Sequence, residues 1–392
     1  MKAVESAVAA SGTGPVDAIP FSRPPRPSAG LRYVEEALAS GRIGANGELG
    51  RRCASWLERR TGSPRAFLTP SCTHALEMAA VLAGLGPGDE VIMPSYTFFS
   101  TATAVAMRGA TPVFVDIRED TMNLDERLVE EAVTDATRAI VPVHYAGVAC
   151  EMDAILDIAA RNRLVVIEDA AHGVLATYRG RALGTMGQFG CLSFDEQKNL
   201  SCGEGGALLV QDQEASERGE LVAQKGSTRA AFLRGEALEY TWVDLGSAWS
   251  ASDLAAGTLL AQLEDAEAIT ARRMRVWRSY HAAFEQAERS GRARRPVVPD
   301  HCGHNAHIYS LLLPTPQRRD ELIGALAGQA ITAQGHYTPL HSSPAGLRHG
   351  RTHGDLPVTR RVAKTLVRLP IWSDLGEADV DRVAEAVIRA LR

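Results

Sequence analysis

The most constraining feature of this sequence is an alternation of short apolar runs and helical stretches between residues 65 and 210. Apolar runs with the length of buried strands occupy residues 66–68, 91–93, 112–115, 140–143, 164–167, 190–194 and 207–210. Helical stretches occupy residues 74–85, 100–108, 125–132 and 152–162. Continuous apolar strands separated by helices are typical of a mainly parallel sheet covered on both faces. We therefore predict an α/β fold, a mainly parallel sheet sandwiched by helices, with ligands at the carboxyl ends of the strands.

Length and local composition indicate two domains and an N-terminal tail. The chain has 392 residues, of which 45% are hydrophobic, so it can form more than one core. Residues 1–30 are rich in Ala, Gly, Pro and Ser, and we expect a tail that lies on the body. We assign residues 31–265 to a large α/β domain. A strand-like run at 308–313 and an amphipathic helix at 378–391 indicate a smaller α+β domain over residues 266–392.

Charge and cysteine usage exclude several classes of function. The formal net charge is −5 and no basic run is present, so we expect no nucleic-acid polymer as a partner. No segment reaches the ~18 consecutive apolar residues of a membrane span, and the first residues lack the pattern of a signal peptide. The six cysteines are scattered without CxxC spacing, as in reduced proteins. We therefore expect a cytoplasmic protein with no membrane partner.

Small polar residues follow the first strand, where a helix is expected to begin. Ser71, Cys72 and Thr73 occupy this position. Free backbone N–H groups at a helix N-terminus suit a phosphate, although an ordinary N-cap has the same composition. After the second strand, Tyr96 and Phe98 could cover a flat ligand or could pack in the core.

Two acids follow the strand at 164–167. Glu168 and Asp169 are adjacent, so their side chains point to opposite faces of the sheet. We expect one to reach solvent or a helix cap. The other would enter the cleft, where a carboxylate needs a cationic partner such as a protonated pyridine nitrogen. Both could instead cap the next helix. His172 follows Asp169 by three residues, on the same side of that turn.

Lys198 lies in a polar loop between the last two apolar strands. It is either a solvated residue of a surface β-hairpin or a reactive amine that forms a Schiff base at the edge of the sheet. The other strand ends favour the second interpretation. A phosphate would bind at residues 71–73 and Ser193, and an aldehyde at Lys198. A ring nitrogen would face Asp169 beneath Phe98. These groups together fit one ligand, pyridoxal 5'-phosphate (PLP).

Longer segments resemble a known enzyme family. EDAAH at 168–172, SFDEQKN at 193–199 and GEGGA at 203–207 are similar to segments of the DegT/DnrJ-type sugar aminotransferases, a branch of the fold type I, aspartate-aminotransferase-like enzymes. The likeness covers nearly the whole body and includes LTPSCTHALEMAA, GDEVIMPSYTF, VFVDIREDTMN, VPVHYAGVACEMD, GRALGTMG and YTPLHSSPAG. It is greatest for the subgroup that acts on dTDP-4-dehydro-6-deoxyglucose.

The resemblance implies a role for each residue around the cofactor ring. Lys198 would hold PLP covalently and move the proton during transfer. Asp169 would keep the pyridine nitrogen protonated. His172 would lie near the ring hydroxyl, where the family has Gln or His, and Phe98 would stack on the ring.

The resemblance also implies how the phosphate is held. Ser193 and the backbone of Cys72 and Thr73 would bind it. Many family members add an Asn from the partner subunit of a homodimer, within a GYNYR-like segment. Here Ala248 stands in the place of that Asn, so the contact would fall to Ser247 or to backbone.

Substrate-binding candidates are His144, Tyr145, Lys225, Arg229, Trp249, His336 and Tyr337. A nucleotide diphosphate needs cations, which Lys225 or Arg229 could supply, although either is equally well a solvated surface charge. The segment HCGHNAH at 301–307 has residue types that suit zinc. No second group of ligands lies at the usual spacing, so we expect a loop and no metal.

We therefore expect a PLP-dependent transaminase that works in two halves. L-Glutamate would give its amine to the cofactor, which would then aminate the 4-keto group of dTDP-4-dehydro-6-deoxy-D-glucose for a deoxyaminosugar pathway. A dehydratase of the same fold would have His in place of Lys198. Three alternatives stay open: another keto sugar, a keto-cyclitol, and a non-catalytic protein that keeps the fold. The galacto or gluco configuration of the product is open too.

Overall fold

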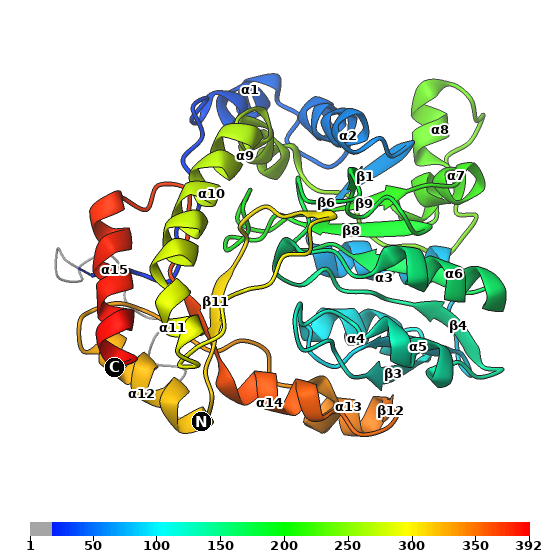
Figure 1. Cartoon of the computed structure of the whole chain (residues 1–392). Coiled ribbons are helices and arrows are strands. Elements are labelled where there is room, and N and C mark those ends of the chain that lie inside the picture. Colours follow the sequence, from blue (N-terminus) through cyan, green and yellow to red (C-terminus); the bar gives the residue numbers. More distant parts are fainter. Residues whose placement is uncertain (1–17) are drawn as a thin grey trace.

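The computed structural model describes residues 18–392, and its centre is a sheet of eight strands (Figure 1). The strand order is β1–β9–β8–β5–β4–β2–β3–β12. These strands are β1 (Arg65–Thr69), β2 (Glu90–Pro94), β3 (Thr111–Val115), β4 (Thr137–Ile140), β5 (Val165–Asp169), β8 (Phe189–Ser193), β9 (Gly206–Val210) and β12 (Arg351–Thr352). In this sheet β9 alone is antiparallel to its neighbours, so the predicted mainly parallel α/β fold is confirmed.

The two faces of the sheet carry separate hydrophobic cores because side chains alternate along each strand. Along β2, Val91 and Met93 belong to one core and Ile92 to the other. The first core is covered by helices α3 (Cys72–Leu82), α4 (Phe99–Ala106) and α7 (Gln213–Val222). The second is covered by α2 (Glu48–Thr61), α5 (Glu126–Ala132), α6 (Met152–Asn162) and α9 (Asp253–Glu264).

A third core forms the small domain. Its elements are α10 (Ala266–Ala283), α11 (Glu285–Arg289), β11 (Tyr309–Leu312), α12 (Pro316–Ala327), β13 (Leu366–Leu369) and α15 (Glu377–Ala390). Figure 1 shows α10 running from the large domain into this unit, beside α15. The C-terminal region also contributes to the large domain, because β12 pairs in parallel with β3.

The N-terminal tail is described from residue 18 onward, and residues 1–17 of the predicted tail lie outside the described residues. Ile19 is buried in the small-domain core and forms a bridge with Ile331. The remaining elements are α1 (Arg32–Ser40), η2 (Tyr145–Gly147), β6 (Thr177–Tyr178), β7 (Arg181–Ala182), α8 (Arg229–Arg234), β10 (Cys302–Gly303), η3 (Leu340–Ser342), α13 (Pro344–His349) and α14 (Pro357–Thr365). Over residues 18–392, no helix has the length and apolarity needed to cross a bilayer.

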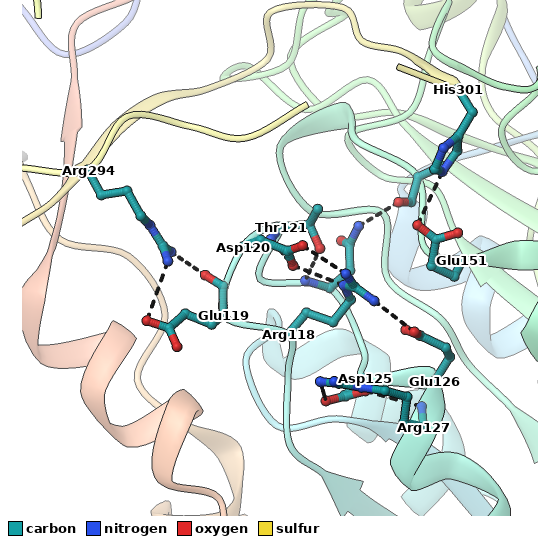
Figure 2. A network of polar contacts seen from close by, with 12 residues as sticks. Arg118, Glu119, Asp120, Thr121, Asp125, Glu126, Arg127, Glu151, Arg294 and His301 are labelled. Carbon is teal, nitrogen blue, oxygen red and sulfur yellow. Dashed lines mark hydrogen bonds and ion pairs between the residues drawn. The ribbon is translucent and has the colours of Figure 1, made fainter. Parts of the chain in front are cut away.

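A polar network joins the turn after β3 to the small domain (Figure 2). Arg118 donates to Asp120 at 2.9 Å and to Glu126 at 2.7 Å, which closes the turn on itself. Arg294 donates to the backbone carbonyl of Glu119 in the same turn. Single exposed ion pairs contribute only about 0–1 kcal/mol each. Of these contacts, the one from Arg294 joins the small domain to the turn of the large domain.

Candidate active site

A cavity of about 460 Å³ lies between the carboxyl ends of β5 and β8 and the small domain. The large domain lines it with the N-termini of α3 and α4 and with the loop after β8. The small domain contributes His307, His336, Tyr337 and Arg368, and the N-terminal segment contributes Phe21. The cavity is therefore at the edge of the sheet where strand-end residues meet, as the topology predicts.

Lys198 lies in the loop that connects β8 and β9, and it lines this cavity. The two strands are antiparallel neighbours, so the connection is a hairpin in topology, but its lysine is half-buried. Burial lowers the pKa of Lys198, while the charges of Asp195 and Asp169 oppose this effect. A lysine with a lowered pKa is more often a free amine, which is the nucleophilic form.

Asp169 is buried at the end of β5 and also lines the cavity. Its Oδ2 accepts a hydrogen bond of 2.7 Å from Thr101 Oγ1, and its Oδ1 accepts one of 3.2 Å from the Ala171 N–H. Burial raises the pKa of Asp169, and the Thr101 hydrogen bond acts in the opposite direction. A cationic ligand group beside this carboxylate would favour its ionised form.

Glu168 corrects one expectation from the sequence. It points to the opposite side of the strand from Asp169, but it reaches neither solvent nor a helix cap, because it is fully buried. Its carboxylate accepts the backbone N–H groups of the loop at residues 184–187 and contacts His144 Nε2 at 2.9 Å. Glu168 thus holds the loop between β7 and β8 and takes no part in the cavity.

The N-terminus of α3 lies at the cavity, where the anion cradle is predicted. The Ser71 hydroxyl accepts from the His74 N–H at 3.2 Å, as an ordinary N-cap does, and residues 71–73 also line the cavity together with Ser193. Gly206 passes so close to this helix start that a Cβ there would lie 2.4 Å from Cys72 N. The absence of a side chain at residue 206 therefore lets β9 approach the cradle.

His172 presents a defined hydrogen-bond donor. Its Nδ1 accepts from the Ala146 N–H at 3.2 Å, so Nε2 bears the proton and donates to Tyr337 OH at 3.3 Å. Burial lowers the pKa of His172 well below its usual value, and the imidazole is neutral. Phe98 lines the cavity nearby, with its ring centroid 6.5 Å from that of Tyr337.

Three residues that support this site were missed at the level of sequence. The His307 ring lies 4.1 Å from the His172 ring, centroid to centroid, and His307 Nδ1 donates to Asn199 Oδ1 at 2.9 Å. Asn199 Nδ2 in turn donates to the Asn305 carbonyl at 2.8 Å. Asn305 Nδ2 donates to the carbonyl of His172 at 2.7 Å. These contacts lock the residue after Lys198 to the small domain.

The HCGHNAH segment therefore serves the site through hydrogen bonds. His301 Nε2 lies 3.2 Å from Glu151 Oε1. In the sequence, Glu151 is far from Asn199, the side chain that His307 contacts. In the part of the chain that the structure describes, no three or more His, Cys, Asp and Glu side chains gather in a way that could hold a metal ion.

Two of the seven substrate candidates, His336 and Tyr337, line the cavity. Tyr145 lies behind them, and its hydroxyl is 2.7 Å from His336 Nδ1. His144 is fully buried, and its Nδ1 accepts from the Cys150 N–H at 3.1 Å while Nε2 contacts Glu168. Because both ring nitrogens are engaged inside the protein, the structure removes His144 from the substrate candidates.

The other candidates lie away from this cavity. Trp249 is buried in a core, and its Nε1 donates to Glu77 Oε2 at 3.3 Å. Lys225, Arg229 and Ser247 are exposed and do not line the cavity of their own chain. A ligand in this cavity would therefore not contact them.

The residues of the cavity fit PLP. A half-buried amine, a buried carboxylate and a helix N-terminus share one space, and these are the groups that an aldehyde, a pyridine nitrogen and a phosphate require. The fold is that of the aspartate-aminotransferase-like PLP enzymes. Fold and site together thus define a fold type I PLP-dependent enzyme.

Comparisons with known proteins give the family. Residues 28–388 match the DegT/DnrJ/EryC1/StrS aminotransferase family. The chain is 35% identical over 377 residues to the spore coat polysaccharide biosynthesis protein SpsC of Bacillus subtilis, covering 94% of this chain and 96% of that protein. The chain belongs to this family of sugar aminotransferases, and its cofactor is PLP.

Solved structures agree with this assignment. The aminotransferase TlmJ from Streptoalloteichus hindustanus has a TM-score of 0.87 and 30% identity, covering 95% of this chain and 98% of that one. DesV of S. venezuelae, solved in complex with a ketimine intermediate, has a TM-score of 0.86 and 30% identity, covering 96% of this chain and 100% of that one.

Proposed function

We propose that the protein transfers the amino group of L-glutamate to the 4-keto group of dTDP-4-dehydro-6-deoxy-D-glucose. The product is a dTDP-4-amino-4,6-dideoxyhexose. The observation that carries the transamination is that Lys198 and Asp169 line one cavity beside the N-terminus of α3. Support for the 4-keto sugar comes from the long sequence segments that resemble enzymes acting on it.

The residues of the chain divide the chemical work. Bound PLP supplies an electron sink for the charge that develops next to the transferred nitrogen. Asp169, held by Thr101, keeps the ring nitrogen protonated. Lys198 takes the proton from the substrate carbon and returns it, a task that suits an amine whose pKa is lowered by burial. The neutral His172, which lines the cavity, would lie beside the cofactor ring.

The proposal includes a homodimer in the cytoplasm. An apolar surface follows α8, where Leu238 is 99% exposed and Trp242 is 72% exposed. Exposed apolar patches of this kind mark contacts between proteins. Lys225, Arg229 and Ser247 flank this patch, so in a dimer they would lie near the partner's cavity. All six cysteines are free, which supports a reducing compartment.

The experiment is a substrate comparison with purified holoenzyme and L-glutamate. The 4-keto sugar nucleotide is compared with the corresponding 3-keto sugar nucleotide and with a keto-cyclitol, and products are identified by NMR. We expect the 4-keto substrate to have the highest kcat/KM, and the NMR couplings at C4 assign the galacto or gluco product. A preference for the 3-keto sugar or the cyclitol would refute the proposed substrate. If neither glutamate nor any other amino acid transfers its amine to the cofactor of the purified holoenzyme, transamination is refuted.

A further inference from the structure

The wall of the cavity contains a buried arginine. Arg273 lies on α10, the helix that runs from the large domain into the small one, and its side chain is almost fully buried (Figure 1). In the described part of the chain no carboxylate forms an ion pair with it. Burial lowers its pKa to about 9, so the guanidinium keeps its charge at pH 7. A buried cation without a counterion is unfavourable, so its hydrogen bonds must offset this cost.

The guanidinium of Arg273 holds the turn that precedes β11. Its Nε donates to the Ala306 carbonyl at 3.2 Å, and its Nη2 donates to the His307 carbonyl at 2.8 Å. Ala306 has a φ of 53°, in the left-handed region that residues with a Cβ rarely adopt. Such a conformation persists where the surrounding structure enforces it. The two charge-assisted bonds from Arg273 supply this constraint and fix the backbone from which the His307 side chain extends.

Asn305 holds the same turn from the other side. Its Nδ2 donates to the carbonyl of His172 at 2.7 Å, and its Oδ1 accepts from the His307 N–H at 3.1 Å. The turn is thus clamped between the segment of His172 and α10. Arg273 provides the contact with α10.

The ring of His307 connects this turn to two parts of the cofactor site. Its centroid lies 4.1 Å from that of His172, with 33° between the ring planes, so the two imidazoles are in contact. Its Nδ1 donates to Asn199 Oδ1 at 2.9 Å, and Asn199 is the residue after Lys198. A displacement of His307 would therefore disturb both His172 and the loop that carries the reactive amine.

We propose that Arg273 is a positioning residue of the PLP site, which holds the His307 ring against His172 and against the loop of Lys198. This inference rests on the place of His172 beside the cofactor ring in the proposed function. Arg273 acts through His307 and takes no proton itself. A guanidinium suits this task because its planar fork donates to two carbonyl groups at once.

The test compares the wild-type protein with Arg273→Gln and Arg273→Lys. The first readout is the Kd for PLP, from fluorescence titration of the apoprotein. The second is the visible circular dichroism per bound cofactor at saturating PLP, which reports how the ring is oriented in its asymmetric site. Arg272→Gln is the matched control, because Arg272 precedes Arg273 on α10, pairs with Asp374 at 3.3 Å and does not line the cavity.

We expect Arg273→Gln to raise the Kd for PLP roughly 10-fold, the effect of losing one charged hydrogen bond. The circular dichroism per bound cofactor should weaken or change sign, because the ring is no longer held in one orientation. Arg273→Lys keeps the charge without the fork and should be intermediate, which covers the case that Arg273→Gln folds poorly. Arg272→Gln should match the wild type in both readouts.

A double-mutant cycle tests whether Arg273 acts through His307. His307→Phe keeps a flat ring but loses the bond to Asn199. In this background Arg273→Gln should raise the Kd for PLP by less than about threefold, because residues that act as one unit are not additive.

Two results would overturn the inference. One is wild-type circular dichroism per bound cofactor in both Arg273 variants. The other is an equal effect of Arg273→Gln on the Kd in the wild-type and His307→Phe backgrounds. Neither readout uses an amino donor, so a wild-type protein that transfers no amine would refute the proposed function by a separate measurement.

Discussion

Replacement of Glu168 by Gln should destabilise the fold strongly, although the residue is outside the cavity. Oε1 of Glu168 accepts from the Met186 and Gly187 N–H groups at 2.6 and 2.7 Å. Oε2 accepts from the Gly184 N–H at 2.8 Å and from His144 Nε2 at 2.9 Å. Every hydrogen bond at this carboxylate is therefore donated to it.

A glutamine can keep only one of the two oxygens. If its carbonyl replaces Oε1, its NH2 group faces the Gly184 N–H and His144 Nε2. His144 cannot adapt by moving its proton, because its Nδ1 must accept from the Cys150 N–H. Two charge-assisted bonds are lost, at about 1.5–3 kcal/mol each, so we expect a loss of about 3–6 kcal/mol.

The assay is the denaturant midpoint of each variant, followed by tryptophan fluorescence. Glu151→Gln is the control, because Glu151 also contacts a histidine, His301 at 3.2 Å, but is partly exposed. It should lose less than about 1 kcal/mol. A Glu168→Gln protein within about 1 kcal/mol of the wild type would refute the reasoning.

The same carboxylate predicts a pH dependence. Burial opposes its ionisation, but the hydrogen bond from His144 and those from the N–H groups of Gly187 and Gly184 outweigh burial and hold the pKa of Glu168 below its usual 4.5. A depressed pKa in the folded state stabilises the fold above the unfolded value. The contribution of Glu168 should therefore be present above about pH 4.5 and be lost as the pH falls through the depressed pKa. This acid-side loss should be absent in Glu168→Gln.

Further predictions concern the cofactor cradle and its supports. Thr101→Val removes the donor to Asp169 and should raise the pKa of that acid further, with an increase of roughly tenfold in the Kd for PLP measured by fluorescence titration; an unchanged Kd would contradict the role of Thr101. Gly206→Ala places a methyl group against Cys72 N and should abolish PLP binding in the same titration, whereas tight binding would show that β9 can shift. Asn305→Ala removes two 2.7 Å hydrogen bonds to carbonyl groups, so it should lower kcat and reduce the free energy of unfolding by about 2–3 kcal/mol. A loss of stability with no change in kcat would show that Asn305 supports only the fold.

The large sheet was predictable from sequence because buried parallel strands are continuous apolar runs. All seven predicted runs overlap strands of the sheet. The eighth strand, β12, has two residues and no apolar run, so the sequence pattern does not predict it. Its place beside β3 depends on tertiary contacts alone. β13 was also missed, because a charged residue interrupts its short apolar pattern at Arg368.

The candidate site was predictable where it lies at strand ends. Lys198, Asp169 and Ser193 needed only the topology of the sheet to be brought together. Asn199, Asn305 and His307 were missed because their contacts join segments about a hundred residues apart. The one local signal, the His-rich run at 301–307, suggested metal ligands, whereas its polar groups support His172 and the loop of Lys198.

The sequence also did not show which residue of an adjacent pair would line the cavity. Glu168 and Asp169 both follow a buried strand, yet only Asp169 reaches the cavity. His144 and Tyr145 lie side by side, and neither lines it. Alternation along a strand indicates opposite directions, but not which direction faces a ligand.

The central claim is that Lys198 is the residue that holds PLP, and the chain allows a direct measurement. It contains four lysines, Lys2, Lys198, Lys225 and Lys364. Borohydride reduction of the holoenzyme fixes a lysine-bound cofactor permanently, and peptide mass spectrometry then locates the added mass. We predict that the mass is on the Lys198 peptide and on no other, and that Lys198→Ala carries none. A stoichiometric label on Lys225 or Lys364, or a visible PLP absorbance that leaves every lysine unlabelled, would contradict the account.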